Sequence, residues 1–152
     1  MRFLTTVRHT GTTYFEKGLR AEYGKEFDLE HISEEVFNNL DLKDIIYTTY
    51  RDPYRVAVSW VNRNMVNVPK LWLDSWGAYK KLLTINPIVL DVTKQVQEGI
   101  DFGSKKVNSM NDAYLLHRDL DENNYKSIYQ YIPKEHIDYA IECCGELYKG
   151  ER

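Results

Sequence analysis

Residues 2–13 read RFLTTVRHTGTT and place an apolar, β-branched segment directly before a glycine that is flanked by threonines. Such a segment, with few charges, predicts a buried β-strand over residues 2–8. The residues that follow predict a helix over 12–23. A strand that enters a helix through a short turn is typical of an α/β unit, so this stretch sets the fold class.

The same order of elements recurs along the chain. Residues 44–50 (DIIYTTY) and 87–92 (PIVLDV) predict two further strands. Strands separated by helices imply a parallel sheet with right-handed crossovers. The expected fold class is therefore α/β, with a small central parallel sheet flanked by helices and a helix-rich C-terminal part. We expect helices over residues 33–40, 53–64, 70–83, 93–98 and 134–148, and irregular chain over 24–32 and 99–112.

Local signals support several of these boundaries. Ser33 and Asp52 suit the N-cap positions of their helices, and Pro53 suits a first helical position. The tryptophans lie in predicted helices, where we expect them to pack in the core rather than form a carbohydrate-stacking surface: Trp60, Trp72 and Trp76.

Composition excludes several classes of protein. The chain has 152 residues, the size of one domain, and no repeat or linker divides it, so we expect a single domain over 1–152. Its net charge of −3 argues against nucleic-acid binding. No segment approaches the roughly 18 apolar residues of a membrane span, so we expect no membrane partner and a cytoplasmic location. Cys143 and Cys144 are adjacent, lack metal-ligand spacing and are expected to be reduced.

Two stretches with binding chemistry follow predicted strands. RHTGTT (8–13) and RDPYRVAVS (51–59) each lead from a strand end into a helix. In an open parallel sheet, ligands bind outside the carboxyl ends of the strands, and a helix N-terminus favours an anion. Both stretches are therefore candidate phosphate sites.

The first stretch has the residues that such a site needs. Gly11 allows the backbone to approach a phosphate closely, and three threonines add hydroxyl donors: Thr10, Thr12 and Thr13. Arg8 or His9 can add positive charge. The alternative is an ordinary strand–turn–helix junction with threonine caps. The P-loop consensus GxxxxGK[ST] is absent, which argues against an ordinary ATPase or GTPase.

The second stretch supplies a second candidate phosphate ligand set. Arg51 ends a strand, and Ser59 follows eight residues later. Asp52 and Ser59 are separated by about two helical turns, which puts Ser59 on the face of the helix start. The arginine guanidinium could donate two parallel hydrogen bonds to a phosphate that the serine hydroxyl also binds. Alternatively, Arg51 pairs with a carboxylate and Ser59 only packs.

Together the two stretches resemble the signatures of sulfotransferases that use 3′-phosphoadenosine 5′-phosphosulfate (PAPS). The family's Lys-Ser-Gly-Thr-Thr-Trp is similar to residues 9–14, HTGTTY. Its Arg-(Asn/Asp)-Pro, with Val-Ser ending eight residues past the arginine, is similar to residues 51–59. Clear similarity covers roughly the first 60 residues.

The resemblance implies a P-loop-like three-layer fold and a role for each matched residue. It implies that residues Thr10, Gly11, Thr12 and Thr13 cradle the 5′-phosphosulfate. Tyr14, in the place of the tryptophan, would stack on adenine, and Arg51 with Ser59 would bind the 3′-phosphate. His31 lies twenty residues before Arg51, where many members have their catalytic base. Glu30 is the alternative base, and a plain surface histidine is the alternative for His31.

The chain also departs from the family. The lysine that stabilises the leaving phosphate is replaced by His9, so a protonated His9, or Arg8, would have to supply that charge. The family's C-terminal Arg-Lys-Gly loop has its nearest counterpart in Gly103-Ser104-Lys105-Lys106, which makes Lys105 and Lys106 candidate 3′-phosphate ligands, although a loop lysine pair is usually just solvated.

The expected function is therefore transfer of a sulfuryl group from PAPS to a hydroxyl or amine acceptor, with 3′-phosphoadenosine 5′-phosphate (PAP) as product and no metal. The acceptor would be a small molecule, glycan or peptide; neither its identity nor the oligomeric state follows from the sequence. Two alternatives stay open: an inactive PAPS- or PAP-binding module, suggested by the missing lysine, and a P-loop kinase of a small metabolite.

Overall fold

A central parallel sheet carries the fold. The structure, a computed structural model, describes residues 1–62, 69–91 and 128–150. Four strands pair in the order β2-β1-β3-β4, and all three pairings are parallel. The strands are β1 (Arg2–Thr6), β2 (Phe27–His31), β3 (Ile45–Tyr50) and β4 (Ile88–Asp91).

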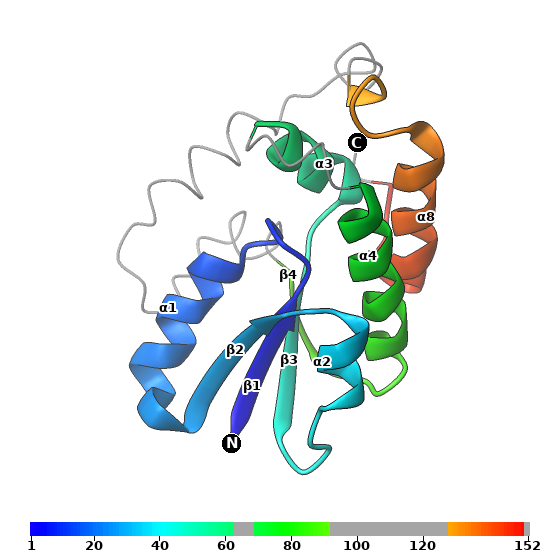
Figure 1. The fold of residues 1–152 in the computed structure, drawn as a ribbon. Helices are drawn as coiled ribbons and strands as arrows, with labels where there is room; N and C mark the ends of the chain where they lie inside the picture. Colours follow the sequence, from blue (N-terminus) through cyan, green and yellow to red (C-terminus); the bar gives the residue numbers. More distant parts are fainter. Residues whose placement is uncertain (63–68, 92–127, 151–152) are drawn as a thin grey trace.

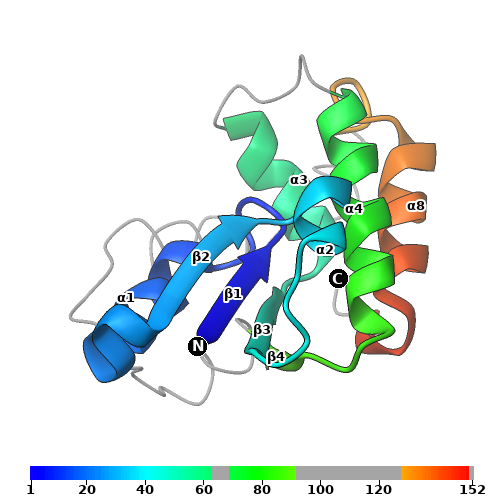
Figure 2. The ribbon, with the colours of Figure 1, turned by 60° about the horizontal axis from the view of Figure 1, so that its bottom comes forward.

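Helices cover both faces of this sheet, so the described part has three layers (Figure 1). Helix α1 (Thr12–Tyr23) lies on one face, where Phe15 and Leu19 pack with Leu4, Tyr47 and Leu90 of the strands. The opposite face is covered by α2 (Glu34–Asn38), α4 (Pro69–Leu83) and α8 (Lys134–Cys144). Figure 2 shows α2 beside α4 on this face. Helix α3 (Pro53–Asn62) follows β3 and packs against α8.

An aromatic cluster lies where α3, α4 and α8 meet. Trp60, Trp72 and Trp76 are each 1% exposed, as expected for core residues. The ring of Trp72 meets Trp60 edge-on at 5.1 Å between centroids and lies 5.7 Å from Trp76. Its indole Nε1–H donates to the carbonyl of His136 at 2.8 Å. One side chain therefore joins α3, α4 and α8.

Most expected elements are confirmed. The helix over 12–23 has the expected bounds, and the strands and remaining described helices lie within a few residues of their predictions. Both expected caps form: Ser33 Oγ accepts from the Val36 N–H at 3.1 Å, and Asp52 Oδ1 accepts from the Tyr54 N–H at 3.0 Å. The final helix ends earlier than expected, at Cys144, because Gly145 adopts a φ of 56° and the chain continues as the 3₁₀ turn η2 (Gly145–Leu147).

The expectation of irregular chain over residues 24–32 is wrong. This segment contains the 3₁₀ turn η1 (Gly24–Glu26) and strand β2. Strand β2 has the sequence FDLEH and pairs only with β1, at the edge of the described sheet. An edge strand with one solvated side alternates polar and apolar residues, and two charges in five residues resemble a loop.

The remaining expectations concern two segments, the cysteines and membrane spans. The short helix over 93–98 and the loop over 99–112 lie outside the described residues. Both cysteines are free thiols on α8, and both are buried. Within the described part of the chain, no helix combines the length and apolar character that a membrane crossing needs.

We predict that Trp72→Ala lowers the free energy of unfolding by about 3–5 kcal/mol, because a large cavity opens where three helices meet. Guanidinium denaturation followed by circular dichroism measures this change. Leu42→Ala is the control: its side chain is 74% exposed, so the expected change is within about 0.5 kcal/mol. A loss in Trp72→Ala no larger than in the control would contradict the packing described here.

Candidate functional site

The strand order creates a topological switch point. From β1 the chain passes through α1, on one face, to β2; it then passes through α2, on the other face, to β3. The winding therefore reverses between the adjacent strands β1 and β3. In open parallel sheets, ligands bind in the crevice at the carboxyl ends of the two strands where this reversal occurs. Residues 7–11 follow β1 and residues 51–52 follow β3, so both loops lie at this switch point.

The loop after β1 is shaped by two left-handed residues. His9 has a φ of 68°, and Gly11, the N-cap of α1, has a φ of 89°. The first N–H groups of a helix have no carbonyl partner within it, so those that follow Gly11 provide donors for an anion. The first turn of α1 carries no acidic side chain that would repel one.

The hydroxyls of Thr10 and Thr12 hold this loop in place. Thr10 Oγ1 donates to the Val7 carbonyl at 2.5 Å and shares a hydrogen bond of 2.5 Å with Thr49 Oγ1 of β3. Thr12 Oγ1 shares one of 2.7 Å with Thr6 Oγ1. Thr10 and Thr12 are buried, whereas Thr13 is exposed. Of the three candidate threonine hydroxyls, only that of Thr13 is open to solvent.

Arg51 joins the two candidate loops. Its guanidinium Nη1 donates to the His9 carbonyl at 3.1 Å, and the side chain is only 2% exposed. The indole of Trp60, on α3, donates to the Arg8 carbonyl at 2.9 Å. Ser59, the other candidate ligand of a 3′-phosphate, is 6% exposed on α3. The two sequence stretches thus lie side by side at the switch point.

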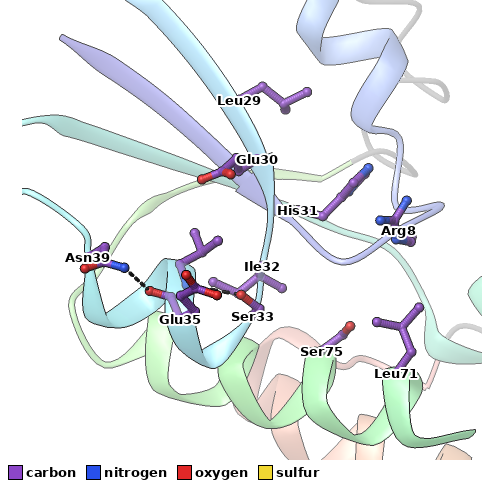
Figure 3. Close-up of a pocket in the computed structure, with 11 residues that line it drawn as sticks. Arg8, Leu29, Glu30, His31, Ile32, Ser33, Glu35, Asn39, Leu71 and Ser75 are labelled. Carbon is purple, nitrogen blue, oxygen red and sulfur yellow. Dashed lines mark hydrogen bonds between the residues drawn. The ribbon is translucent and has the colours of Figure 1, made fainter.

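His31 and Arg8 both line a cavity of about 550 Å³ beside this loop (Figure 3). His31 ends β2 in register with Thr6 of β1, so its ring lies next to the β1–α1 loop. Figure 3 shows the ring turned toward Arg8. Burial lowers the pKa of His31 below its ordinary value, and the positive charge of Arg8 lowers it further. Both effects favour the neutral imidazole, the form that can accept a proton.

The other candidate residues lie in different surroundings. Glu30 also lines the cavity, but alternation along β2 puts its exposed side chain on the opposite face of the strand from His31. Tyr14 is half-buried on α1 and meets Phe15 edge-on at 5.1 Å. The His9 side chain is also half-buried. Lys105 and Lys106 lie outside the described residues.

Sequence reasoning missed several residues that support the site. Tyr79 of α4 is fully buried, and its hydroxyl donates to the Thr49 carbonyl at 2.8 Å, directly beneath the Thr10–Thr49 contact. Burial raises the pKa of Tyr79 well above its ordinary value, so the donor stays protonated. Arg55, in the first turn of α3 and four residues past Arg51, is 7% exposed and is a second buried cation. Thr6 and Thr49, which bond to Thr12 and Thr10, were also missed, and the paired threonines at 5–6 and 48–49 were their available sequence signal.

The comparisons add no relative. The chain matches no protein-family model, no curated protein and no solved structure. Among residues 1–62, 69–91 and 128–150, no three His, Cys, Asp or Glu side chains gather in a group that could hold a metal ion.

We predict that Thr10→Ala lowers the free energy of unfolding by about 1–3 kcal/mol, because it leaves the buried Thr49 hydroxyl without its partner. Thr13→Ala is the matched control, with the same substitution three residues on at an exposed position and an expected change within about 0.5 kcal/mol. Urea denaturation measures both variants. Equal losses would show that the Thr10 contact does not hold the loop.

Proposed function

We propose that this chain is a PAPS-dependent sulfotransferase with a P-loop-like nucleotide site at the switch point between β1 and β3. The observation that carries the proposal is the hydrogen bond from Arg51 to the His9 carbonyl. It joins two stretches that are 42 residues apart, each similar to one of the family's phosphate-binding signatures. Two accidental similarities would not be expected to meet at the one crevice where the fold favours a ligand.

The donor would bind through both stretches. The N-terminus of α1, from Gly11 to Thr13, would hold the 5′-phosphosulfate mainly through backbone N–H groups, because the Thr10 and Thr12 hydroxyls hold the loop itself. Arg51 and Ser59 would bind the 3′-phosphate. A guanidinium has five N–H donors, so the bond from Arg51 to the loop is compatible with a phosphate contact. Tyr14 would stack on the adenine.

The transfer would need one base and one cation near the donor. The acceptor oxygen attacks sulfur in line, and an O–S bond forms as the bond from sulfur to the bridging phosphate oxygen breaks. That oxygen leaves with the bonding electron pair, giving PAP, while the acceptor proton passes to His31. Arg8, or a protonated His9, would stabilise the negative charge on the leaving phosphate. An amine acceptor would react in the same way through its neutral nitrogen.

A binding module without catalysis is the second candidate, and one observation favours it. His9, which stands where the family has lysine, is half-buried, and its carbonyl accepts the bond from Arg51. If neither its imidazole nor Arg8 reaches the bridging oxygen, the nucleotide would bind without turnover. The small-metabolite kinase differs from both in its nucleotide, because it would use ATP with Mg²⁺.

We predict that PAP raises the melting temperature more than AMP or ATP does, because only PAP carries the 3′-phosphate that Arg51 and Ser59 would bind. At a concentration of 100 times the Kd, PAP should add about 2.7 kcal/mol to the free energy of unfolding. Differential scanning fluorimetry with each nucleotide, with and without Mg²⁺, measures the shifts. Equal shifts for PAP and AMP would show that the protein has no 3′-phosphate site. A larger shift for ATP with Mg²⁺ would favour the kinase.

The variant Arg51→Lys sharpens this test. It keeps the charge and loses the bidentate fork, so PAP affinity should fall at least about tenfold, toward that of AMP. AMP affinity is the internal control, since it reports any damage to the loop that Arg51 braces. An equal loss of PAP and AMP affinity would show that Arg51 only holds the loop in place and does not bind the 3′-phosphate.

We predict that His31→Ala lowers kcat by roughly 10²–10⁴-fold and leaves PAP affinity unchanged, because it removes the base without touching the nucleotide site. A protonated imidazole cannot accept a proton, so kcat/KM in the unsubstituted protein should fall on the acid side. The midpoint should lie below about 6.5, since burial and Arg8 lower the pKa of His31. Assays with labelled PAPS across pH measure both effects.

Two variants serve as controls for the base. Arg8→Gln should move the acid midpoint upward, toward 6.5, by removing the nearby positive charge. Glu30→Gln tests the alternative base. If Glu30→Gln abolishes turnover and His31→Ala does not, the assignment to His31 is wrong.

A further inference from the structure

A buried serine of α4 opens into the cavity beside His31. Ser75 is 3% exposed, and it lines the cavity together with His31 and Arg8. Figure 3 shows the Ser75 hydroxyl pointing from α4 into the cavity, on the side where Arg8 lies. Among the described residues, this hydroxyl has no hydrogen-bond partner. An almost fully buried side chain thus presents an unpaired hydroxyl to the cavity.

The lack of a partner points to a ligand. A serine within a helix can donate to the carbonyl four residues earlier, here that of Leu71, but Ser75 forms no such bond. Most buried hydroxyl groups are paired, because an unpaired one has lost its hydrogen bonds to water. Since Ser75 faces a cavity of about 550 Å³, a small molecule bound there would supply the partner.

The cavity wall around Ser75 is apolar. Leu71 lies one turn earlier on α4 and also lines the cavity. Ile32, which is 3% exposed, and the partly buried Val36 add further apolar surface. Such side chains gain by contact with carbon rather than with charged groups. A ligand that fits this wall has an apolar skeleton and directs one polar atom to Ser75 and His31.

From this arrangement we infer that Ser75 holds the acceptor of the sulfuryl transfer, and that the acceptor is an alcohol with an apolar carbon skeleton. The inference rests on the proposed function for the identity of the reaction. An alcohol oxygen has two lone pairs, so one can accept from the Ser75 hydroxyl while the other attacks sulfur. The O–S bond forms, the bond from sulfur to the bridging phosphate oxygen breaks, and the alcohol proton passes to His31.

An amine does not fit this arrangement as well. A neutral amine nitrogen has a single lone pair, and attack on sulfur requires it. The nitrogen therefore cannot accept from Ser75 in the reactive position. The ammonium form has no lone pair at all, and its charge has the same sign as that of Arg8. Ser75 thus favours oxygen over nitrogen as the attacking atom.

A matched set of probes tests the inference on the protein without nucleotide. Cyclohexanol, cyclohexylamine and cyclohexanecarboxylate share one ring and differ in the polar group. Nuclear magnetic resonance titration, followed at the His31 imidazole, reports binding in this cavity; His31→Ala identifies the signal. At neutral pH, cyclohexanol should bind more tightly than either charged probe. Ser75→Ala should weaken cyclohexanol binding roughly 2–10-fold, the effect of one hydrogen bond between uncharged groups.

Asp74→Ala is the matched control, because Asp74 precedes Ser75 on α4 but is exposed and does not line the cavity. It should leave cyclohexanol binding unchanged. The melting temperature of Ser75→Ala should be unchanged or raised, since the hydroxyl has no partner among the described residues. A lowered melting temperature would show a structural role for the hydroxyl and overturn the inference. Tighter binding of a charged probe, or equal cyclohexanol binding by Ser75→Ala and the unsubstituted protein, would also overturn it.

The inference and the proposed function can fail separately. Cyclohexanol binding that depends on Ser75, in a protein that does not bind PAP, would keep the alcohol site and contradict the sulfotransferase. PAP binding without cyclohexanol binding would keep the nucleotide site and contradict the role of Ser75. If both ligands bind, kcat/KM for cyclohexanol with labelled PAPS should fall in Ser75→Ala, while PAP affinity stays unchanged.

Discussion

The site depends on the contacts that join the loop after β1 to β3 and α3. Arg51 reaches back to the His9 carbonyl, Thr49 holds Thr10, and Trp60 holds the Arg8 carbonyl. These bonds fix a backbone in which His9 and Gly11 both have left-handed torsion angles. Because Arg51 and Thr10 are almost fully buried, breaking either bond would leave a polar group in the interior without its partner. The shape of the loop is therefore a property of two strands and not of the loop alone.

Much of the fold could be predicted because its core strands have uniform surroundings. Strands β1 and β3 are covered on both faces, so their residues read as apolar, β-branched runs, and the caps at Ser33 and Asp52 mark helix starts in the sequence. Strand β2 does not read as an apolar, β-branched run, because it lies at an edge, where Asp28 and Glu30 face solvent. Only pairing with β1 makes it a strand, and pairing is a tertiary property.

The sequence predicted the two loops of the candidate site, but not which of their side chains hold the loops in place. The sequence indicated that residues 8–13 and 51–59 follow strands, and the strand order brings them together. It did not indicate that the hydroxyls of Thr10 and Thr12 turn inward, since a threonine that braces a loop and one that binds a phosphate have the same spacing. Tyr79 lies on a helix 28 residues past Arg51. Its contact with Thr49 depends on how α4 packs, which no local pattern encodes.

The residue at position 9, where the sulfotransferase signature that this chain resembles has lysine, bears directly on the proposed chemistry. A lysine side chain at position 9 would offer a cation at neutral pH, whereas an imidazole does so only when protonated; the backbone carbonyl that accepts from Arg51 would be the same for either residue. Arg8, one residue earlier, is exposed and lies by His31. Its charge favours the neutral form of that imidazole, which a base requires, and the same charge suits a departing phosphate. A single arginine could thus serve both ends of the transfer. If the chain is a sulfotransferase, as we propose, its leaving-group cation would lie one residue before the position that lysine has in that family's signature.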